Sequence, residues 1–242
     1  MTSLRAPAKL TWFLEMTGRR ADGYHLLRSE MRTLALADEL VISPSDVTSL
    51  EIDGPFAEGL STRDNLVIRA LELAGATAKI HLTKNIPHGG GLGGGSADAA
   101  AVLRWAGVTD HDLAARLGAD VPFCLTGGRA LVSGVGEVVS PLEVARDAVS
   151  IVVPPFSLST AEVYRRFDDL GGQGEGRNHL RDAAESVEPR LKALRQWWRG
   201  EFGQDLELCG SGSTCFYEGH AGLTATVSTP VGDVTVYETE TI

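Results

Sequence analysis

The chain has little cysteine and no excess of positive charge. Its 242 residues include only three cysteines, Cys124, Cys209 and Cys215, which are widely spaced and form no C-x-x-C pair. This odd number and spacing argue against a disulfide framework and a cysteine zinc site, and they predict a reducing compartment. The formal net charge of -10 argues against a nucleic-acid partner, because such a surface needs clustered basic residues.

The chain also lacks long apolar runs. No segment approaches the length needed to cross a bilayer, and the first residues lack the basic and apolar regions of a secretion signal. We therefore expect a cytoplasmic protein that does not bind membranes. A hydrophobic content of 43% with 22% charged residues is typical of a globular protein, and the length allows one large domain or two small ones.

Glycine, by contrast, is abundant and concentrated in one place. Six glycines lie within 89–95, between a strand-like run at 79–85 and an alanine-rich helical run from Ser96 to about Trp105. Glycine lets a phosphate approach the backbone N–H groups closely. The start of the following helix points unpaired N–H donors and its positive dipole end at the loop. The pattern favours a triphosphate ligand.

Other readings of this loop are weaker. A Walker A loop requires lysine before the hydroxyl residue, whereas Gly95 directly precedes Ser96. The dinucleotide fingerprint is met formally by glycines 89, 91 and 94, but the acids at 110 and 112 follow a helix rather than a second strand. A plain flexible linker seldom lies between a strand and a helix.

Periodicity predicts an α+β chain in two parts. Strands are expected at 4–17, 41–43, 50–52, 129–132, 206–208, 224–228 and 234–239, and helices at 65–74, 111–117 and 181–198. The last helix contains Pro189, and 171–176 reads as a loop. The boundary is placed near 149–156, because Pro154 and Pro155 favour an extended connection.

The glycine loop resembles the phosphate-binding motif of the GHMP kinases. Four further segments occur in the same order as in that family: Ala6–Leu10, Thr17–His25, Gly118–Phe123 and Gly210–Phe216. The resemblance spans nearly the whole chain, and the G-R-R-x-D-G-Y-H sequence at 18–25 is its most specific part. It implies a two-domain GHMP kinase fold, with a nucleotide-binding N-terminal domain at 1–150, a smaller ferredoxin-like C-terminal domain at 151–242, and the active site between them.

Within this superfamily, the motifs are most similar to members that act on a cytidine diphosphate-linked methylerythritol. The resemblance implies ATP- and Mg²⁺-dependent phosphorylation of the 2-hydroxyl of that small molecule in non-mevalonate isoprenoid biosynthesis, by a monomer or weak dimer. A homoserine or mevalonate-type kinase is the main alternative. A non-enzymatic nucleotide sensor would need the glycine loop but neither Lys9 nor Asp120.

Two residues are expected to be catalytic. Phosphoryl transfer needs a group that orients or deprotonates the attacking hydroxyl. From local sequence alone, Asp120 is equally well explained as such a base or as a helix or turn cap. The resemblance favours the base, and it makes Lys9 the active-site cation that favours the ionised form of Asp120 or of the substrate hydroxyl.

The resemblance also implies the binding residues. Tyr24, His25 and Tyr164 are expected to hold the cytosine, and Thr11 stands where the family usually has asparagine. For ATP we expect contacts from Asn65, Lys84, Pro87, Gly89, Gly90, Gly91, Leu92, Gly93, Gly94, Gly95 and Ser96. The Ser96 hydroxyl is suited to a phosphate or Mg²⁺, or to capping its helix, while no cluster of protein metal ligands is expected. Ala97 replaces the family's usual second hydroxyl, and the C-terminal half is short.

Overall fold

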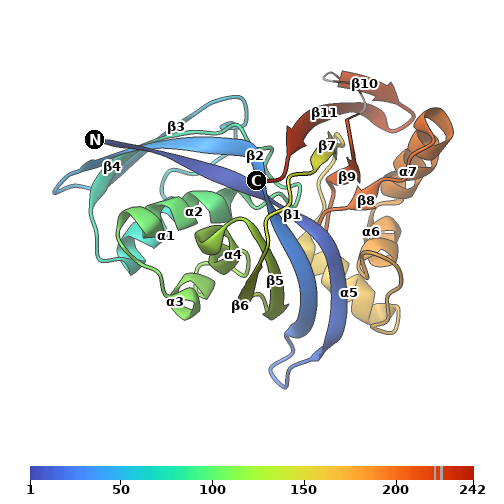
Figure 1. The fold of residues 1–242 in the computed structure, drawn as a ribbon, viewed down its shortest axis with the longest axis horizontal. Coiled ribbons are helices and arrows are strands. Elements are labelled where there is room, and N and C mark those ends of the chain that lie inside the picture. The colour runs from blue at the N-terminus through green and yellow to red at the C-terminus, as the bar shows by residue number, and fades with distance from the viewer. Residues whose placement is uncertain (221, 224–225) are drawn as a thin grey trace.

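A long antiparallel hairpin runs through the middle of the molecule. The structure, a computed structural model, describes residues 1–220, 222–223 and 226–242. Strands β1 (Thr2–Arg19) and β2 (His25–Pro44) form the hairpin, with Arg19 opposite His25 at the turn. Figure 1 shows it passing from the first sheet toward helix α5 of the second half. The strands predicted at 4–17 and 41–43 are confirmed, but the second is 20 residues long.

The N-terminal half is a mixed sheet covered by helices. Its strand order is β3-β4-β2-β5-β6, with β1 paired to β2. The remaining strands are β3 (Ser49–Asp53), β4 (Ala78–Thr83), β5 (Arg129–Gly134) and β6 (Val138–Leu142). The helices are α1 (Leu66–Leu73), α2 (Gly94–Trp105), α3 (His111–Ala115) and α4 (Val121–Thr126).

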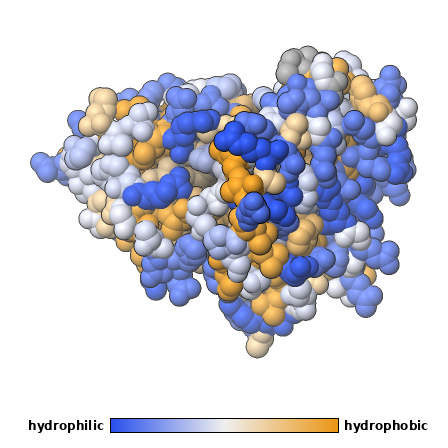
Figure 2. Space-filling view, in the orientation of Figure 1, coloured by the Kyte–Doolittle hydropathy of each residue, from blue (hydrophilic) through white to orange (hydrophobic). Residues whose placement is uncertain are grey.

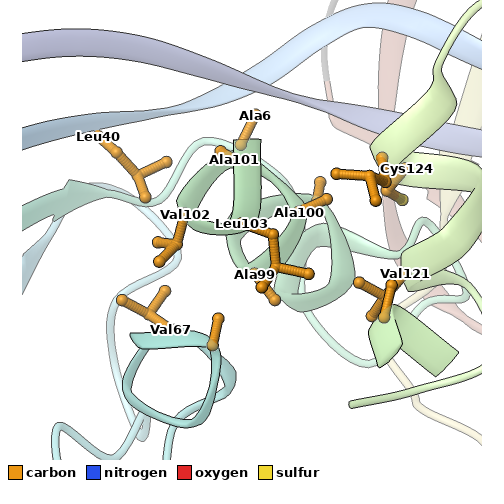
Figure 3. Close-up of a cluster of buried hydrophobic side chains, with 14 of the residues drawn as sticks. Ala6, Leu40, Val67, Ala99, Ala100, Ala101, Val102, Leu103, Val121 and Cys124 are labelled. Atoms are coloured by element: carbon orange, nitrogen blue, oxygen red, sulfur yellow. The ribbon is translucent and has the colours of Figure 1, made fainter. Parts of the chain in front are cut away.

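Helix α2 is the centre of this half. Alanines from Ala97 to Ala101 and the following Val102 and Leu103 are buried. Figure 3 shows this apolar helix between Val67 of α1, Leu40 of β2, and Val121 and Cys124 of α4. Small side chains allow neighbouring elements to pack closely around the helix, so its N-terminus is held rigidly beneath the glycine loop.

The C-terminal half is an antiparallel sheet with helices. The strands, in the order β10-β11-β7-β9-β8, are β7 (Ala148–Val153), β8 (Glu207–Leu208), β9 (Cys215–Glu218), β10 (Thr226–Thr229) and β11 (Gly232–Glu240). The helices α5 (Thr160–Asp169), α6 (Arg181–Val187) and α7 (Pro189–Phe202) all lie between β7 and β8 in sequence.

The strand order of this sheet is that of a ferredoxin-like unit, whereas one of the connections between its strands differs from that unit. With β7, β8, β9 and β11 numbered one to four, the order is 4-1-3-2 and every pair is antiparallel. A ferredoxin-like unit has a second helix between its third and fourth strands. Among the described residues between β9 and β11 there is no helix, only strand β10. The division at residue 150 stays a prediction, although the second sheet begins with Ala148.

One predicted helix was wrong. Residues 181–198 form two helices, because Glu188 adopts an extended conformation (φ -131°, ψ 90°) and Pro189 begins α7. Proline lacks an N–H and disfavours the helical conformation of the residue before it. The strand predicted at 224–228 corresponds to β10, but Thr224 and Ala225 lie outside the described residues. Helices α4 and α5 and strands β6, β7 and β9 were not predicted.

The β1–β2 hairpin contributes side chains to three hydrophobic cores. Ala6 and Met31 belong to the N-terminal core, Leu14 belongs to the C-terminal core, and Leu10 packs in a third core between the sheets. Most of the face seen in Figure 2 is hydrophilic, with a hydrophobic band near its middle. In the part of the chain that the structure describes, no helix is both long and apolar enough to cross a membrane.

Candidate active site

A cavity of about 1180 Å³ collects the predicted site residues from both halves. It is lined by residues of the β1–β2 hairpin, the glycine loop, the segment before α4, helix α5 and the segment after β8. Eight of the predicted residues line it, namely Lys9, Thr11, Tyr24, His25, Gly91, Ser96, Asp120 and Tyr164. The other predicted nucleotide contacts, Asn65, Lys84, Pro87, Gly89, Gly90, Leu92, Gly93, Gly94 and Gly95, are outside its lining.

Lys9 and Asp120 meet in this cavity from different elements. Lys9 Nζ lies 3.3 Å from Asp120 Oδ2 and donates a hydrogen bond to Thr11 Oγ1 at 3.0 Å. Burial is the largest single influence and would lower the pKa of the Lys9 ammonium, but the acidic groups around it, Asp120 foremost, together raise this pKa above its ordinary value. Lys9 therefore carries a positive charge at neutral pH, directly beside the carboxylate.

The position of Asp120 leaves its carboxylate available. Asp120 occupies the N-cap position of α4, yet its side chain makes no capping hydrogen bond to that helix. About a third of the side chain is exposed, and it lines the cavity. The capping alternative therefore lacks its defining contact, while a role in proton transfer stays a prediction.

The glycine loop leads into the start of helix α2, where backbone N–H groups have no helical acceptor. Gly93, rather than Ser96, is the N-cap of α2, with the left-handed φ of 68°. The first helical hydrogen bond is donated by Ala97 N to Gly93 O, so the N–H groups of residues 94–96 have no helical acceptor. The Ser96 hydroxyl lines the cavity and makes no hydrogen bond within the described residues. This end of α2 can accept an anion.

Two other loop residues make close contacts with the protein around the cavity. The side chain of Leu92 is buried in the core between the sheets, and its carbonyl accepts a hydrogen bond from Lys9 N at 2.9 Å. A Cβ on Gly91 would lie 2.6 Å from the carbonyl oxygen of Cys209. Glycine is thus required at 91 by contact with the C-terminal half, and Leu92 has only its backbone to offer a nucleotide.

A buried ionic cluster holds the backbone that leads into the glycine loop. The Lys84 ammonium is bonded to Asp38 of β2 and, at 2.6 Å, to Asp98 Oδ2 of α2. Asp38 Oδ1 also accepts hydrogen bonds from the backbone of Asn85 at 2.6 Å and of Ile86 at 2.8 Å. The Lys84 side chain is therefore fully engaged inside the protein, and only the backbone nearby is free for the adenine contact that the sequence predicts.

This cluster carries two carboxylates for one ammonium. Burial outweighs the nearby positive charge of Lys84 and raises the pKa of Asp98 to about 7, and the charge of Asp38 adds to this rise. Asp98 Oδ1 is buried without a hydrogen-bond partner among the described residues. The sequence did not indicate Asp38 or Asp98, because an isolated acid in a strand or helix resembles an ordinary surface residue.

The predicted base-binding residues line the same cavity. The His25 ring packs 5.0 Å from that of Tyr164, and His25 Nε2 lies 2.7 Å from Asp168 Oδ1. Burial raises the pKa of the Tyr164 hydroxyl to about 12, so this group stays protonated. Tyr24 is 63% exposed at the rim, with the Arg20 guanidinium 5.5 Å from its ring centroid. A cytosine sandwich between Tyr24 and Tyr164 stays a prediction.

Polar residues of α5 and its surroundings were missed. Asp168, Thr160 and Arg165 of α5 line the cavity, as do Arg116 and Ser211. Thr160 and Ser211 are joined by a hydrogen bond of 2.8 Å between their hydroxyls. These residues come together through contacts between segments far apart in the chain, for which a single sequence gives no local signal.

Asn65 has a structural role that competes with its predicted one. It is the N-cap of α1, where its side-chain oxygen accepts a hydrogen bond from Val67 N at 3.0 Å. Its amide nitrogen donates to the carbonyl of Ser61 at 3.0 Å. An adenine contact stays a prediction and would have to use the remaining hydrogen-bonding capacity of the carboxamide.

The two-sheet fold and a helix-start glycine loop beside a lysine–aspartate pair define the class of the protein as a GHMP kinase. The family described as GHMP kinases N terminal domain matches residues 65–128. The mevalonate kinase of Methanococcus jannaschii has the same fold at 13% identity, with a TM-score of 0.62 over 100% of this chain and 98% of that one.

More similar proteins narrow the class. The 4-diphosphocytidyl-2-C-methyl-D-erythritol kinases of Paracoccus denitrificans and Agrobacterium fabrum are 41% and 33% identical to this chain, each over 87% of it and over 84% and 85% of their own lengths. A crystal structure of 4-(cytidine 5'-diphospho)-2C-methyl-D-erythritol kinase is 32% identical, with a TM-score of 0.77 over 99% of both chains. The chain belongs to the 4-diphosphocytidyl-2-C-methyl-D-erythritol kinase family.

Proposed function

We propose that this chain transfers the γ-phosphoryl group of ATP to the 2-hydroxyl of 4-diphosphocytidyl-2-C-methyl-D-erythritol. The observation that carries the proposal is the contact between Lys9 and Asp120 at 3.3 Å in a cavity that also holds the start of α2. Family membership supports the same reaction. A nucleotide sensor would have no use for a buried ammonium beside a carboxylate that makes no cap.

The chemistry follows from the charges of these side chains. The oxygen of the substrate hydroxyl forms a bond to the γ-phosphorus, while the bond between this phosphorus and the oxygen of the leaving ADP breaks. Asp120 accepts the proton that the hydroxyl loses. The Lys9 ammonium balances the negative charge that gathers on the transferred group. Thr11 Oγ1 accepts a hydrogen bond from Lys9, which fixes the direction of the ammonium.

The cavity has donors suited to a triphosphate and its metal ion. Backbone N–H groups of Gly94, Gly95 and Ser96 face no helical acceptor, so they fit phosphate oxygens. No group of three or more metal-ligating side chains occurs among the described residues, which fits Mg²⁺ held mainly by phosphates with one or two protein oxygens. The Ser96 hydroxyl would supply one such oxygen. Bound Mg²⁺ would neutralise charge on the β- and γ-phosphates.

Other polar residues of the cavity suit the rest of the substrate. Arg19, Arg116 and Arg165 line the wall and offer positive charge to a diphosphate. His25 and Tyr164 provide a hydrogen-bonding ring and a flat aromatic face for a pyrimidine. The overall charge of the chain is negative, so local cations are needed to hold an anionic substrate.

Product identification tests this function. The protein is incubated with ATP, Mg²⁺ and, separately, 4-diphosphocytidyl-2-C-methyl-D-erythritol, its uridine analogue, homoserine and mevalonate. We expect ³¹P NMR and mass spectrometry to show a 2-phosphate on the cytidine compound only. Turnover of homoserine or mevalonate would instead establish another GHMP kinase, and tight ATP binding with no turnover of any alcohol would favour the sensor.

A further inference from the structure

A carboxylate from the C-terminal half holds the imidazole of His25 in the cavity. His25 is the first residue of β2, and Asp168 lies near the end of α5, 143 positions later in the chain. His25 Nε2 and Asp168 Oδ1 are 2.7 Å apart. Both residues line the cavity, with side chains 13% and 32% exposed. The contact therefore joins the two halves of the molecule within the site itself.

The geometry around this contact restricts both partners. The His25 ring lies 5.0 Å from Tyr164 and 6.0 Å, edge-on, from Phe167, so two α5 aromatics restrict its rotation. The other carboxylate oxygen of Asp168 lies 3.5 Å from Arg19 Nη1. Arg19 is itself held by a 3.0 Å hydrogen bond from its Nε to the Gly23 carbonyl. The carboxylate is thus fixed by a cation on one side and an imidazole on the other.

The chemistry of a carboxylate decides which nitrogen of His25 carries the proton. An ionised carboxylate only accepts hydrogen bonds, so Nε2 must donate. In a neutral imidazole the other nitrogen, Nδ1, is then an acceptor. Nδ1 of His25 makes no hydrogen bond within the described residues. The ring therefore presents an acceptor that needs a donor from the ligand.

We propose that Asp168 is a positioning residue that fixes the tautomer of His25 and thereby selects a pyrimidine with an exocyclic amino group. Cytosine offers an N–H donor at its 4-position, whereas uracil has a carbonyl oxygen there and would face Nδ1 acceptor to acceptor. The inference rests on the proposed function, because it takes the nucleobase to lie against His25. A polar site matched to one base edge discriminates strongly, since the wrong base leaves buried groups unpaired.

A purely structural role for the Asp168 contact makes a different prediction. If the carboxylate only joined the two halves, its loss would lower stability and slow the reaction with both substrates by the same factor. A role in choosing the tautomer instead changes the ratio of the two reactions. It also changes the protonation pattern of the His25 ring, which can be observed directly.

The kinetic experiment compares kcat/KM for the cytidine substrate and its uridine analogue. The wild-type protein should prefer cytidine by at least about a hundredfold. Asp168→Leu should reduce this preference at least tenfold, mainly through a higher KM for the cytidine substrate, with the KM for ATP unchanged. Asp168→Glu keeps an acceptor-only group and should retain most of the preference. Asp169→Leu, the same change at the exposed neighbouring position, should behave as wild type.

A spectroscopic measurement keeps the proposal testable if Asp168→Leu folds poorly. In wild-type protein with ¹⁵N-labelled histidine, two-bond ¹H–¹⁵N correlations should show His25 protonated at Nε2, with Nδ1 bare. A proton on Nδ1 with Nε2 bare would overturn the proposal, as would an unchanged cytidine preference in a folded Asp168→Leu variant. Absence of any cytidine preference in the wild-type protein would refute the base assignment itself, and the role of Asp168 with it.

Discussion

Gly93 and Lys9 are in direct contact, so the glycine loop and the active-site ammonium form one unit. A Cβ on Gly93 would lie 2.7 Å from Lys9 Cγ and 3.1 Å from Lys9 Cε. Lys9 N also donates to the carbonyl of Leu92, the preceding loop residue. The absence of a side chain at 93 therefore shapes the position of Lys9 as well as leaving room for phosphate.

Gly93→Ala should impair both ATP binding and phosphoryl transfer. The methyl group must displace Lys9, and alanine is strained at a φ of 68°. We expect a fall of at least about tenfold in kcat and a weaker Kd for ATP, measured by steady-state kinetics and calorimetry. Gly107→Ala is the control, since Gly107 has a φ of 77° with open space around it and should lose only stability. A Gly93→Ala variant with wild-type kcat would contradict this coupling.

Asp120→Asn should separate binding from chemistry. The amide cannot accept the proton of the attacking hydroxyl, and loss of a general base commonly costs about 10²- to 10⁴-fold in rate. Because the start of α2 is untouched, the Kd for ATP should stay within a few-fold of wild type. Single-turnover kinetics and calorimetry together measure the two effects. A kcat close to wild type would reduce Asp120 to a structural residue.

Thr11→Val should slow the reaction without unfolding the protein. Valine has nearly the shape of threonine but lacks the hydroxyl that accepts from Lys9 Nζ. A hydrogen bond to a charged group contributes about 1.5 kcal/mol or more, so kcat should fall by about tenfold. Thr11→Ser retains the hydroxyl and should retain most of the activity. Equal kinetics for the valine and serine variants would show that this hydrogen bond does not position Lys9.

The Asp38–Lys84–Asp98 cluster should make stability fall as pH rises toward neutrality. The pKa of Asp98 is raised to about 7 in the folded protein, above its unfolded value, so the folded state holds an extra proton between about pH 4 and 7. Its stabilising contribution is complete below that window and is lost as pH rises through it. Each pH unit changes the free energy of unfolding by up to about 1.4 kcal/mol.

Asp98→Asn mimics the protonated form and should flatten this profile. Urea unfolding at pH 4.5, 6 and 7.5 would measure the free energy of unfolding for the wild type and the variant. The wild type should lose stability relative to Asp98→Asn as pH rises, whereas Asp112→Asn, at an exposed position in α3, should parallel the wild type. A constant difference between wild type and Asp98→Asn across this range would disprove an extra proton on Asp98.

Local sequence was sufficient for the parts of the structure that depend on local physics. The glycine loop and the alanine-rich helix were predicted because each feature is contained in a few consecutive residues. The length of β2 was not. Glu30 and Arg32 are buried and paired with each other at 2.7 Å, so charged residues interrupt the apolar alternation by which strands are recognised.

The site residues were predictable only where each belonged to a short motif in its own segment of the sequence. Lys9 and Asp120 were identified by resemblance, and the structure supplies the contact between them. Asp168 could not be found in this way. It lies on an amphipathic helix that has many exposed polar residues, and only the return of α5 to the β1–β2 turn brings its carboxylate to His25.

The β1–β2 hairpin contributes side chains to all three cores, and this has a thermodynamic effect. Leu14 of β1 is buried among residues of α5, α6 and α7, while Ala6 and Met31 are buried under α2. Unfolding of either half would remove apolar contacts from the other half. Heating should therefore produce a single cooperative transition, in which the alignment of Lys9, Asp120 and His25 persists until the whole chain unfolds.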